Sequence, residues 1–134
     1  MNPAQVNQLA RVFAVLGPDL ATTPVPVTPD IHERLDAGFD GFRGHVLVSE
    51  FGFSEPWATW ERHPAGDETV ILLSGDATLT LRGPNGDQRV RLASPGDYVI
   101  VPRNTWHTAY PHVPTRMIFI TPGERTENAD TPAA

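Results

Sequence analysis

Residues 60–75 read WERHPAGDETVILLSG and carry the strongest structural signal in the chain. Side chains two residues apart in a strand share a face, so Glu61 and His63 point the same way. Residues 64–67 have the composition of a tight turn, and Glu68 begins the return strand. The stretch predicts a hairpin that brings Glu68 back beside His63 on the inner face. An ionisable Glu68 facing an interior is costly unless it is paired, hydrogen-bonded or bound to a metal.

A second stretch, residues 96–107, reads GDYVIVPRNTWH. A turn at Gly96 leads into a strand, a turn centred on Pro102 closes that strand, and His107 opens the next one. Asn104 lies in this second turn, where asparagine tolerates a positive φ better than most residues. Similar short β runs with turn signals between them begin at His45, and this pattern is typical of an antiparallel sandwich or barrel.

Together the two stretches resemble the motifs of the cupins, which are small β-barrels. The first cupin motif reads G-x5-H-x-H-x3-4-E-x6-G, and the second reads G-x5-P-x-G-x2-H-x3-N. The resemblance covers residues 43–122 and implies a small single-domain bacterial-type cupin, an all-β antiparallel barrel or jelly roll. The matching positions are Glu61-x-His63-x4-Glu68-x6-Gly75 and Gly96-x5-Pro102-x-Asn104-x2-His107.

The resemblance also implies a metal site. In the family, the two histidines and the glutamate of the first motif and the histidine of the second bind one divalent metal. Carried over position by position, the implied ligands in this chain are Glu61, His63, Glu68 and His107.

The chain departs from the family pattern at four positions. Glu61 stands in place of the first histidine. A glutamate at this position also occurs in some cupins, such as ureidoglycine aminohydrolases. Asn104 replaces the second-motif glycine, Pro111 its final asparagine, and Glu55 the leading glycine of the first motif.

The donor set limits the metal and its chemistry. Two neutral imidazoles and two carboxylates neutralise a divalent ion, and this N₂O₂ set suits Fe²⁺, Mn²⁺, Ni²⁺ or Zn²⁺. With His63, His107 and one glutamate as ligands, the other glutamate is free to act as a general base. We predict Glu61 as that catalytic base, because Glu68 fills the family's usual carboxylate position. The alternatives are that Glu61 is a fourth ligand or forms an ordinary salt bridge with a neighbouring arginine.

The composition excludes several kinds of chemistry and partner. The chain has 134 residues, enough for one domain, and no cysteine, so thiol nucleophiles, cysteine metal sites and disulfides are excluded. All ten basic residues are arginine, which excludes lysine Schiff bases. The net charge of −6 argues against nucleic-acid or anionic-membrane partners. We expect a cytoplasmic protein, because neither a secretory signal nor an apolar run of roughly 20 residues is visible.

The segments outside the barrel are assigned from local patterns. Residues 1–17 are predicted as an N-terminal helix, because Val6, Leu9, Phe13 and Leu16 recur at helical spacing. Residues 18–42 are predicted as an extended proline-rich arm, and a homodimer is expected in which this arm lies on a partner's sheet edge. The barrel is assigned to residues 43–122 and a disordered tail to residues 123–134.

Two functions remain open from the sequence. One is a metal-dependent enzyme that acts on a small organic molecule as an oxygenase, isomerase or hydrolase. The alternative is a non-catalytic module that binds or senses a small-molecule ligand, since the fold can host both. Trp60 and Trp106 alternate with proposed site residues and are predicted to face away from them, whereas Trp57 has no assignable face.

Overall fold

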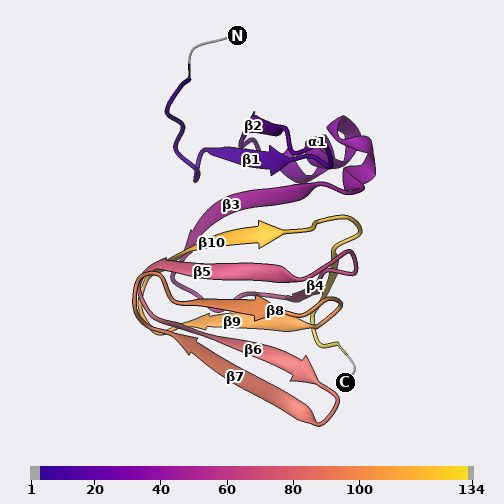
Figure 1. Cartoon of the computed structure of the whole chain (residues 1–134). Helices are drawn as coiled ribbons and strands as arrows, with labels where there is room; N and C mark the ends of the chain where they lie inside the picture. The colour runs from indigo at the N-terminus through magenta and orange to yellow at the C-terminus, as the bar shows by residue number, and fades with distance from the viewer. Residues whose placement is uncertain (1–3, 133–134) are drawn as a thin grey trace.

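The chain folds into two antiparallel β-sheets, seen in a computed structural model that describes residues 4–132. One α-helix and one short 3-10 helix accompany the strands (Figure 1). The strands are β1 Val12–Leu16, β2 Thr22–Pro26, β3 Val46–Phe53, β4 Trp60–Arg62, β5 Glu68–Ser74, β6 Ala77–Gly83, β7 Gly86–Leu92, β8 Tyr98–Val101, β9 His107–Pro111, β10 Thr115–Thr121 and β11 Glu127–Ala129, and the helices are α1 Ile31–Gly38 and η1 Asp40–Phe42.

The strand order differs between the two sheets. The six-stranded sheet has the order β2-β1-β3-β10-β5-β8, and the five-stranded sheet has the order β11-β4-β9-β6-β7. Neighbours in these sheets that are far apart in sequence, such as β3 and β10, close the sandwich by long-range pairing. The predicted all-β architecture of antiparallel strands is therefore confirmed.

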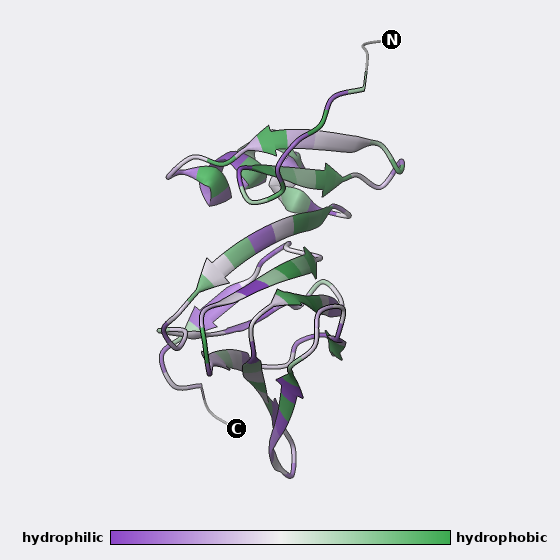
Figure 2. Ribbon diagram, turned by 90° about the vertical axis from the view of Figure 1, so that its left-hand side faces the viewer, coloured by the Kyte–Doolittle hydropathy of each residue, from purple (hydrophilic) through white to green (hydrophobic). Residues whose placement is uncertain are grey.

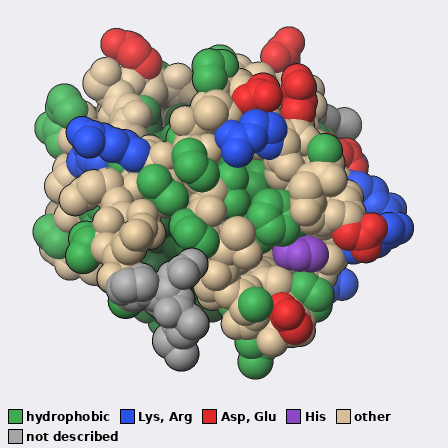
Figure 3. Space-filling model, turned by 90° about the horizontal axis from the view of Figure 1, so that it is seen from above, with side chains coloured by type: hydrophobic (Ala, Val, Ile, Leu, Met, Phe, Trp, Pro, Cys, Tyr) green, Lys and Arg blue, Asp and Glu red, His purple; other side chains and the backbone are tan. Residues whose placement is uncertain are grey.

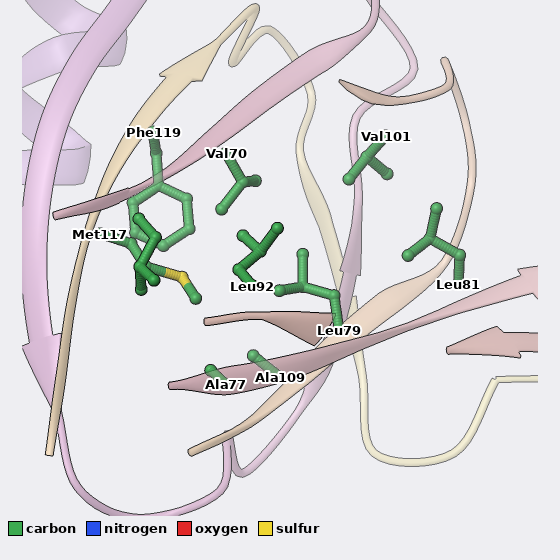
Figure 4. Packing of buried hydrophobic residues seen from close by; sticks show 10 residues of the cluster. Val70, Ala77, Leu79, Leu81, Leu92, Val101, Ala109, Met117 and Phe119 are labelled. Carbon is green, nitrogen blue, oxygen red and sulfur yellow. The ribbon is translucent and has the colours of Figure 1, made fainter. Parts of the chain in front are cut away.

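The main hydrophobic core lies between the two sheets. Along β5, Val70 and Leu72 are fully buried, whereas the alternate residues Ile71 and Leu73 face outward. This period of two continues on the facing strands, whose side chains meet in the same space (Figure 4). Each fully buried aliphatic side chain contributes about 1.5–3 kcal/mol to folding, so this cluster stabilises the frame that carries the site.

A second hydrophobic cluster joins the N-terminal elements to the barrel. The β1–β2 hairpin and α1 lie above β3, at one end of the molecule (Figures 1 and 2). From above, hydrophobic side chains occupy the middle of this face and charged ones lie mainly around its margin (Figure 3). The buried members of the cluster are Phe13, Val15, Val25, Ile31, Leu35, Phe42 and Leu47.

The predicted helix over the first 17 residues is wrong where the structure describes it; residues 1–3 lie outside the described part. Residues 12–16 form β1, with Phe13 and Val15 buried and their neighbours less so. Pairing with β2 and β3 buries this alternating pattern, and that tertiary contact outweighs the weaker helical spacing.

The single α-helix instead lies within the segment predicted to be an extended arm. α1 buries Ile31 and Leu35, which are four residues apart and therefore share one helix face. The arm is extended only in part, at β2. Among the described residues, no helix is long and apolar enough to cross a membrane.

The predicted disordered tail is also wrong over part of its length, and residues 133–134 lie outside the described part. Residues 127–129 form β11, which pairs antiparallel with β4 at the edge of the five-stranded sheet. Arg62 of β4 donates two side-chain hydrogen bonds to Glu127 of β11. The tail is thus held against the strand that carries Glu61.

Replacing Gly75 with alanine should destabilise the fold strongly. Gly75 has a φ of +98°, and an added Cβ would lie 2.6 Å from the Pro114 carbonyl oxygen and 2.7 Å from the Thr115 Cα. Gly86 has a φ of +114° but no atom within 4 Å of the same position, so Gly86→Ala isolates the backbone strain. We expect Gly75→Ala to lower the free energy of unfolding by at least about 2 kcal/mol more than Gly86→Ala in urea denaturation. Equal losses would contradict this packing argument.

Candidate metal centre

The four predicted site residues come together at one end of the barrel interior. Glu61 lies in β4 and pairs in register with His107, the first residue of β9. His63 follows the end of β4, and Glu68 is the first residue of β5. The turn between β4 and β5 thus returns Glu68 to His63, as predicted, and the second stretch delivers His107 to the same place. The predicted hairpin pairing is wrong, because β4 and β5 belong to different sheets and the turn crosses from one sheet to the other.

The side chains of this cluster, Glu61, His63, Glu68 and His107, approach one another closely. Their possible ligand atoms all lie within 4.8 Å of one another. The Nε2 atoms of His63 and His107 lie 3.2 and 3.0 Å from carboxylate oxygens of Glu68. The same two nitrogens lie 3.5 and 3.6 Å from Oε1 of Glu61.

Most of the cluster is buried and lacks aligned hydrogen-bond partners. His107 is 0% exposed, Glu68 2% and His63 4%. Among the described residues, the Nε2 atoms of both histidines and Oε1 of Glu68 are buried side-chain atoms with no hydrogen-bond partner. The short N···O separations above are therefore contacts without the alignment of hydrogen bonds. Each such buried polar atom costs about 1–3 kcal/mol unless something else satisfies it.

Two hydrogen bonds fix the position of the loop that carries His63 relative to the loop before His107. The Asn104 backbone N–H donates to the His63 carbonyl oxygen at 3.0 Å. The Arg103 backbone N–H donates to Oδ1 of Asp67 at 2.8 Å. Asn104 has a φ of +60°, as its turn position predicted, and this conformation directs its N–H toward the first loop.

Hydrogen bonds at Nδ1 set the tautomers of both neutral histidines. Thr126 donates its hydroxyl hydrogen to the Gly123 carbonyl at 3.1 Å, so it accepts the bond from Nδ1–H of His63 at 2.9 Å. Nδ1–H of His107 donates to the carbonyl oxygen of Thr105 at 3.0 Å. In the neutral form, each Nε2 therefore presents a lone pair to the centre of the cluster.

The two carboxylates have different surroundings. Oε2 of Glu68 accepts a hydrogen bond from the hydroxyl of Thr121 at 2.6 Å, which leaves Oε1 free. The side chain of Glu61 is 27% exposed. The neighbouring Arg62 forms its salt bridge with Glu127. The alternative that Glu61 pairs with Arg62 is therefore not observed. Glu68 is thus held rigidly in the interior, and Glu61 is the accessible carboxylate.

These atoms fit a divalent metal ion. Two ligands that are each about 2.1 Å from one ion lie about 3.0 Å apart at a right angle and about 3.4 Å apart in a tetrahedron. The observed N···O separations of 3.0–3.6 Å fall close to these values. One cation would satisfy all three unpartnered buried atoms at once and neutralise both carboxylates.

The charges of the metal-free cluster shift the pKa values in opposite directions. Burial alone would lower the histidine pKa values, but the two carboxylates outweigh it and raise the pKa of His63 to about 9 and that of His107 to about 10. Burial alone would raise the carboxyl pKa values, but the imidazoles lower the pKa of Glu61 to about 2 and also lower that of Glu68. Without metal, the cluster is thus two ion pairs at neutral pH.

A cavity of about 600 Å³ adjoins the cluster, and Glu61, His63 and Glu68 form part of its wall. Trp57 also lines it, 6.2 Å from the ring of His107, so this tryptophan has a place in the site that the sequence left open. Trp60 and Trp106 stack instead on Arg82 and Arg62, and neither lines this cavity.

Sequence reasoning missed the hydroxyl side chains that support the cluster. Thr121 is the last residue of β10, and its alternation with buried Met117 and Phe119 could have placed it on the inner face. Thr126 lies in the segment assigned to a disordered tail, and no local pattern marked it. Its hydrogen bond to His63 depends on the pairing of β11 with β4.

The family follows from comparison with known proteins. A family model described as "Cupin domain" matches residues 49–121, which include all four side chains of the cluster. The chain belongs to the cupin family. No match was found among curated proteins.

This cupin is similar in structure to several solved proteins. It is similar to a cupin superfamily protein from Desulfitobacterium hafniense, with 28% identity, a TM-score of 0.48, and coverage of 57% of this chain and 65% of that one. A variant of Bacillus subtilis oxalate decarboxylase is 16% identical, with a TM-score of 0.51, and the match covers 63% of this chain and 23% of the decarboxylase chain. An oxalate oxidase is 15% identical, with a TM-score of 0.51, and the match covers 60% of this chain and 44% of the oxidase chain. The chain spans less than two thirds of each, and the last two likenesses concern the fold alone.

Thr126→Val should weaken metal binding while the cluster keeps its four side chains. Valine cannot accept the Nδ1–H bond of His63, so the imidazole loses its orientation. Loss of such an outer hydrogen bond costs about 10–100-fold in metal affinity, which chelator competition with Zn²⁺ would measure. Thr126→Ser keeps the hydroxyl and should bind Zn²⁺ like the unmodified protein. Equal affinity in both variants would show that this bond does not support the site.

The metal-free protein should lose stability as the pH rises. The histidine pKa values are raised on folding, so the ion pairs contribute fully below the unfolded value of about 6.5. That contribution is lost as the pH passes through about 9 to 10. After chelator treatment, the unmodified protein should therefore melt at a higher temperature than His63→Gln at pH 6.5, and this difference in melting temperature should shrink toward pH 9. An advantage over His63→Gln that stays constant across this pH range would contradict the prediction.

Proposed function

We propose that this cupin binds one divalent transition metal through His63, His107 and Glu68 and catalyses a reaction of a small organic molecule. The observation that carries the proposal is the convergence of three buried, unpartnered polar atoms from three segments of the chain. Such atoms are rare in folded proteins, so a shared convergence point favours a ligand that satisfies them together. The neutral tautomers set by Thr126 and Thr105 support the same interpretation.

The donor set narrows the choice of metal. Imidazole nitrogen and carboxylate oxygen suit Fe²⁺, Mn²⁺, Ni²⁺ or Zn²⁺. Bacillus subtilis oxalate decarboxylase, which shares the fold, has Mn(II) centres, and this keeps Mn²⁺ among the candidates. The bound metal would supply Lewis acidity toward a substrate oxygen or water.

Glu61 is the residue we assign to proton transfer. It is the most exposed member of the cluster, it lines the cavity, and its oxygen lies farther from both Nε2 atoms than those of Glu68 do. A carboxylate in this position can accept a proton from a molecule in the cavity and return it to another atom of that molecule. Glu68 is unsuited to this role because its second oxygen is engaged by Thr121 in the interior.

The cavity supports an enzyme that acts on a small molecule. Ligand pockets in proteins commonly have volumes of about 300–1,000 Å³, and the present cavity of about 600 Å³ is within that range. Its wall includes the proposed base and two proposed ligands, so a molecule inside it would contact the reacting groups directly. A metal-dependent oxygenase, isomerase or hydrolase can use this arrangement. A module that only binds or senses a ligand would use the same cavity without needing Glu61.

Metal analysis of purified protein tests the proposal. Plasma mass spectrometry should find about one equivalent of a transition metal in the unmodified protein and less than about a tenth in His63→Ala and His107→Ala. His112→Ala removes an exposed histidine outside the cluster and should retain the metal. Less than about a tenth of an equivalent in the unmodified protein after reconstitution would sink the proposal.

Glu61→Gln then separates the two roles of this residue. Glutamine preserves the size of the side chain but cannot accept a proton as a carboxylate does. If Glu61 is the base, the variant keeps the metal content of the unmodified protein and loses turnover. If metal is lost together with turnover, Glu61 is a fourth ligand.

A further inference from the structure

One part of the wall of the cavity beside the cluster is aromatic. Phe51, Phe53, Trp57 and Phe119 all line it. Their rings form a continuous series, with centroid distances of 5.9 Å from Phe51 to Phe119 and 5.8 Å from Phe119 to Trp57. The indole of Trp57 continues this series to the ring of His107. A flat ring placed along this wall would therefore reach the cluster from the outside of the molecule.

Part of this aromatic surface is exposed. Phe51 is 43% exposed although it lies on the inner side of β3, between Phe13 and Phe119. Aromatic surface facing water in a concave site gains free energy when an apolar molecule covers it. The side chain of Ser49 lies two residues away on the same face of β3, is 2% exposed, and adds a hydroxyl to the wall. The cavity thus offers an aromatic patch beside uncharged polar side chains, which include Ser49, Thr59 and Asn128.

The charges around the cavity give no excess that would attract an anion. A divalent ion would be neutralised by Glu61 and Glu68. The remaining carboxylate and guanidinium groups in the wall are Asp36 and Arg125, one of each sign and both exposed. An anionic substrate would lose its hydration in the cavity without gaining a net opposite charge. The charge balance therefore favours a neutral molecule.

We propose that the substrate of this cupin is an uncharged aromatic molecule of one or two rings that carries a hydroxyl group. The ring lies against Trp57 and Phe51, and the hydroxyl oxygen faces Glu61 and the metal ligands. On this charge balance, we expect small dicarboxylates such as oxalate to bind more weakly than an uncharged ring. The charge part of this argument rests on the metal-dependent function proposed above, whereas the aromatic wall does not depend on it.

Calorimetric titration of Zn²⁺-loaded protein tests the proposal with three probes. We expect 2-naphthol to bind, 2-naphthoate to bind at least about tenfold more weakly, and oxalate to bind more weakly than both. 2-Naphthol and 2-naphthoate share the ring system, so their difference reports the effect of charge. Oxalate or 2-naphthoate binding more tightly than 2-naphthol would overturn the proposal.

Variants of the wall locate the binding. Trp57→Ala and Phe51→Ala should each weaken 2-naphthol binding by up to about tenfold, since an aromatic contact contributes about 0.5–1.5 kcal/mol. Phe51 is partly exposed, so its variant should fold even if Trp57→Ala does not. Tyr98→Ala removes an aromatic ring on the outer face of β8, 63% exposed, and should leave binding unchanged. An unchanged affinity for 2-naphthol in a folded Phe51→Ala variant would contradict the assignment.

Metal analysis on the same samples separates this proposal from the preceding one. One equivalent of metal without 2-naphthol binding would overturn the substrate class alone. Binding of 2-naphthol that depends on Phe51, in protein that takes up no metal, would support the aromatic substrate and overturn the metal-dependent function.

Discussion

The meeting of two carboxylates and two imidazoles inside the barrel is the constraint on which the rest of the structure depends. Three polar atoms of this cluster are buried without aligned hydrogen-bond partners, and without a ligand only the ion pairs between imidazoles and carboxylates offset the cost of burying them. Apolar side chains at these positions would be more favourable for folding alone. The barrel therefore carries an arrangement that folding does not require, and a bound cation accounts for it in one step. Hydrogen bonds from neighbouring loops and strands keep its three segments together.

The support comes from hydrogen bonds that join segments distant in sequence. The backbone N–H of Asn104 donates to the carbonyl of His63, and the backbone N–H of Arg103 donates to the side chain of Asp67. These two hydrogen bonds connect the two loops. Thr126 and Thr121 then orient one imidazole and one carboxylate. Because these bonds engage the outer atoms of the side chains, the inner atoms remain free for a ligand.

Only part of the cluster follows from local sequence. Glu68 follows His63 after a tight turn, so their proximity could be predicted from the residues themselves. His107 reaches Glu61 through the pairing of β9 with β4, 46 residues apart, and its place in the cluster was implied by the resemblance to the cupin motifs. The N-terminal strand and the C-terminal strand could not be predicted in this way. β11 pairs with β4 across about half of the chain, and β1 is a strand because β2 and β3 flank it. That Glu61 takes the place of a family histidine stays a prediction.

Two of the three misassigned segments help to line the cavity. The match to the family ends at residue 121, yet Arg125, Thr126 and Asn128 line the cavity. Leu35 and Asp36 of α1 line it too, also outside the matched range. The shared barrel thus supplies the cluster, and the flanking segments supply part of the cavity wall. Since one fold hosts many activities, we infer that these flanks, together with the aromatic wall, set which molecule reaches Glu61.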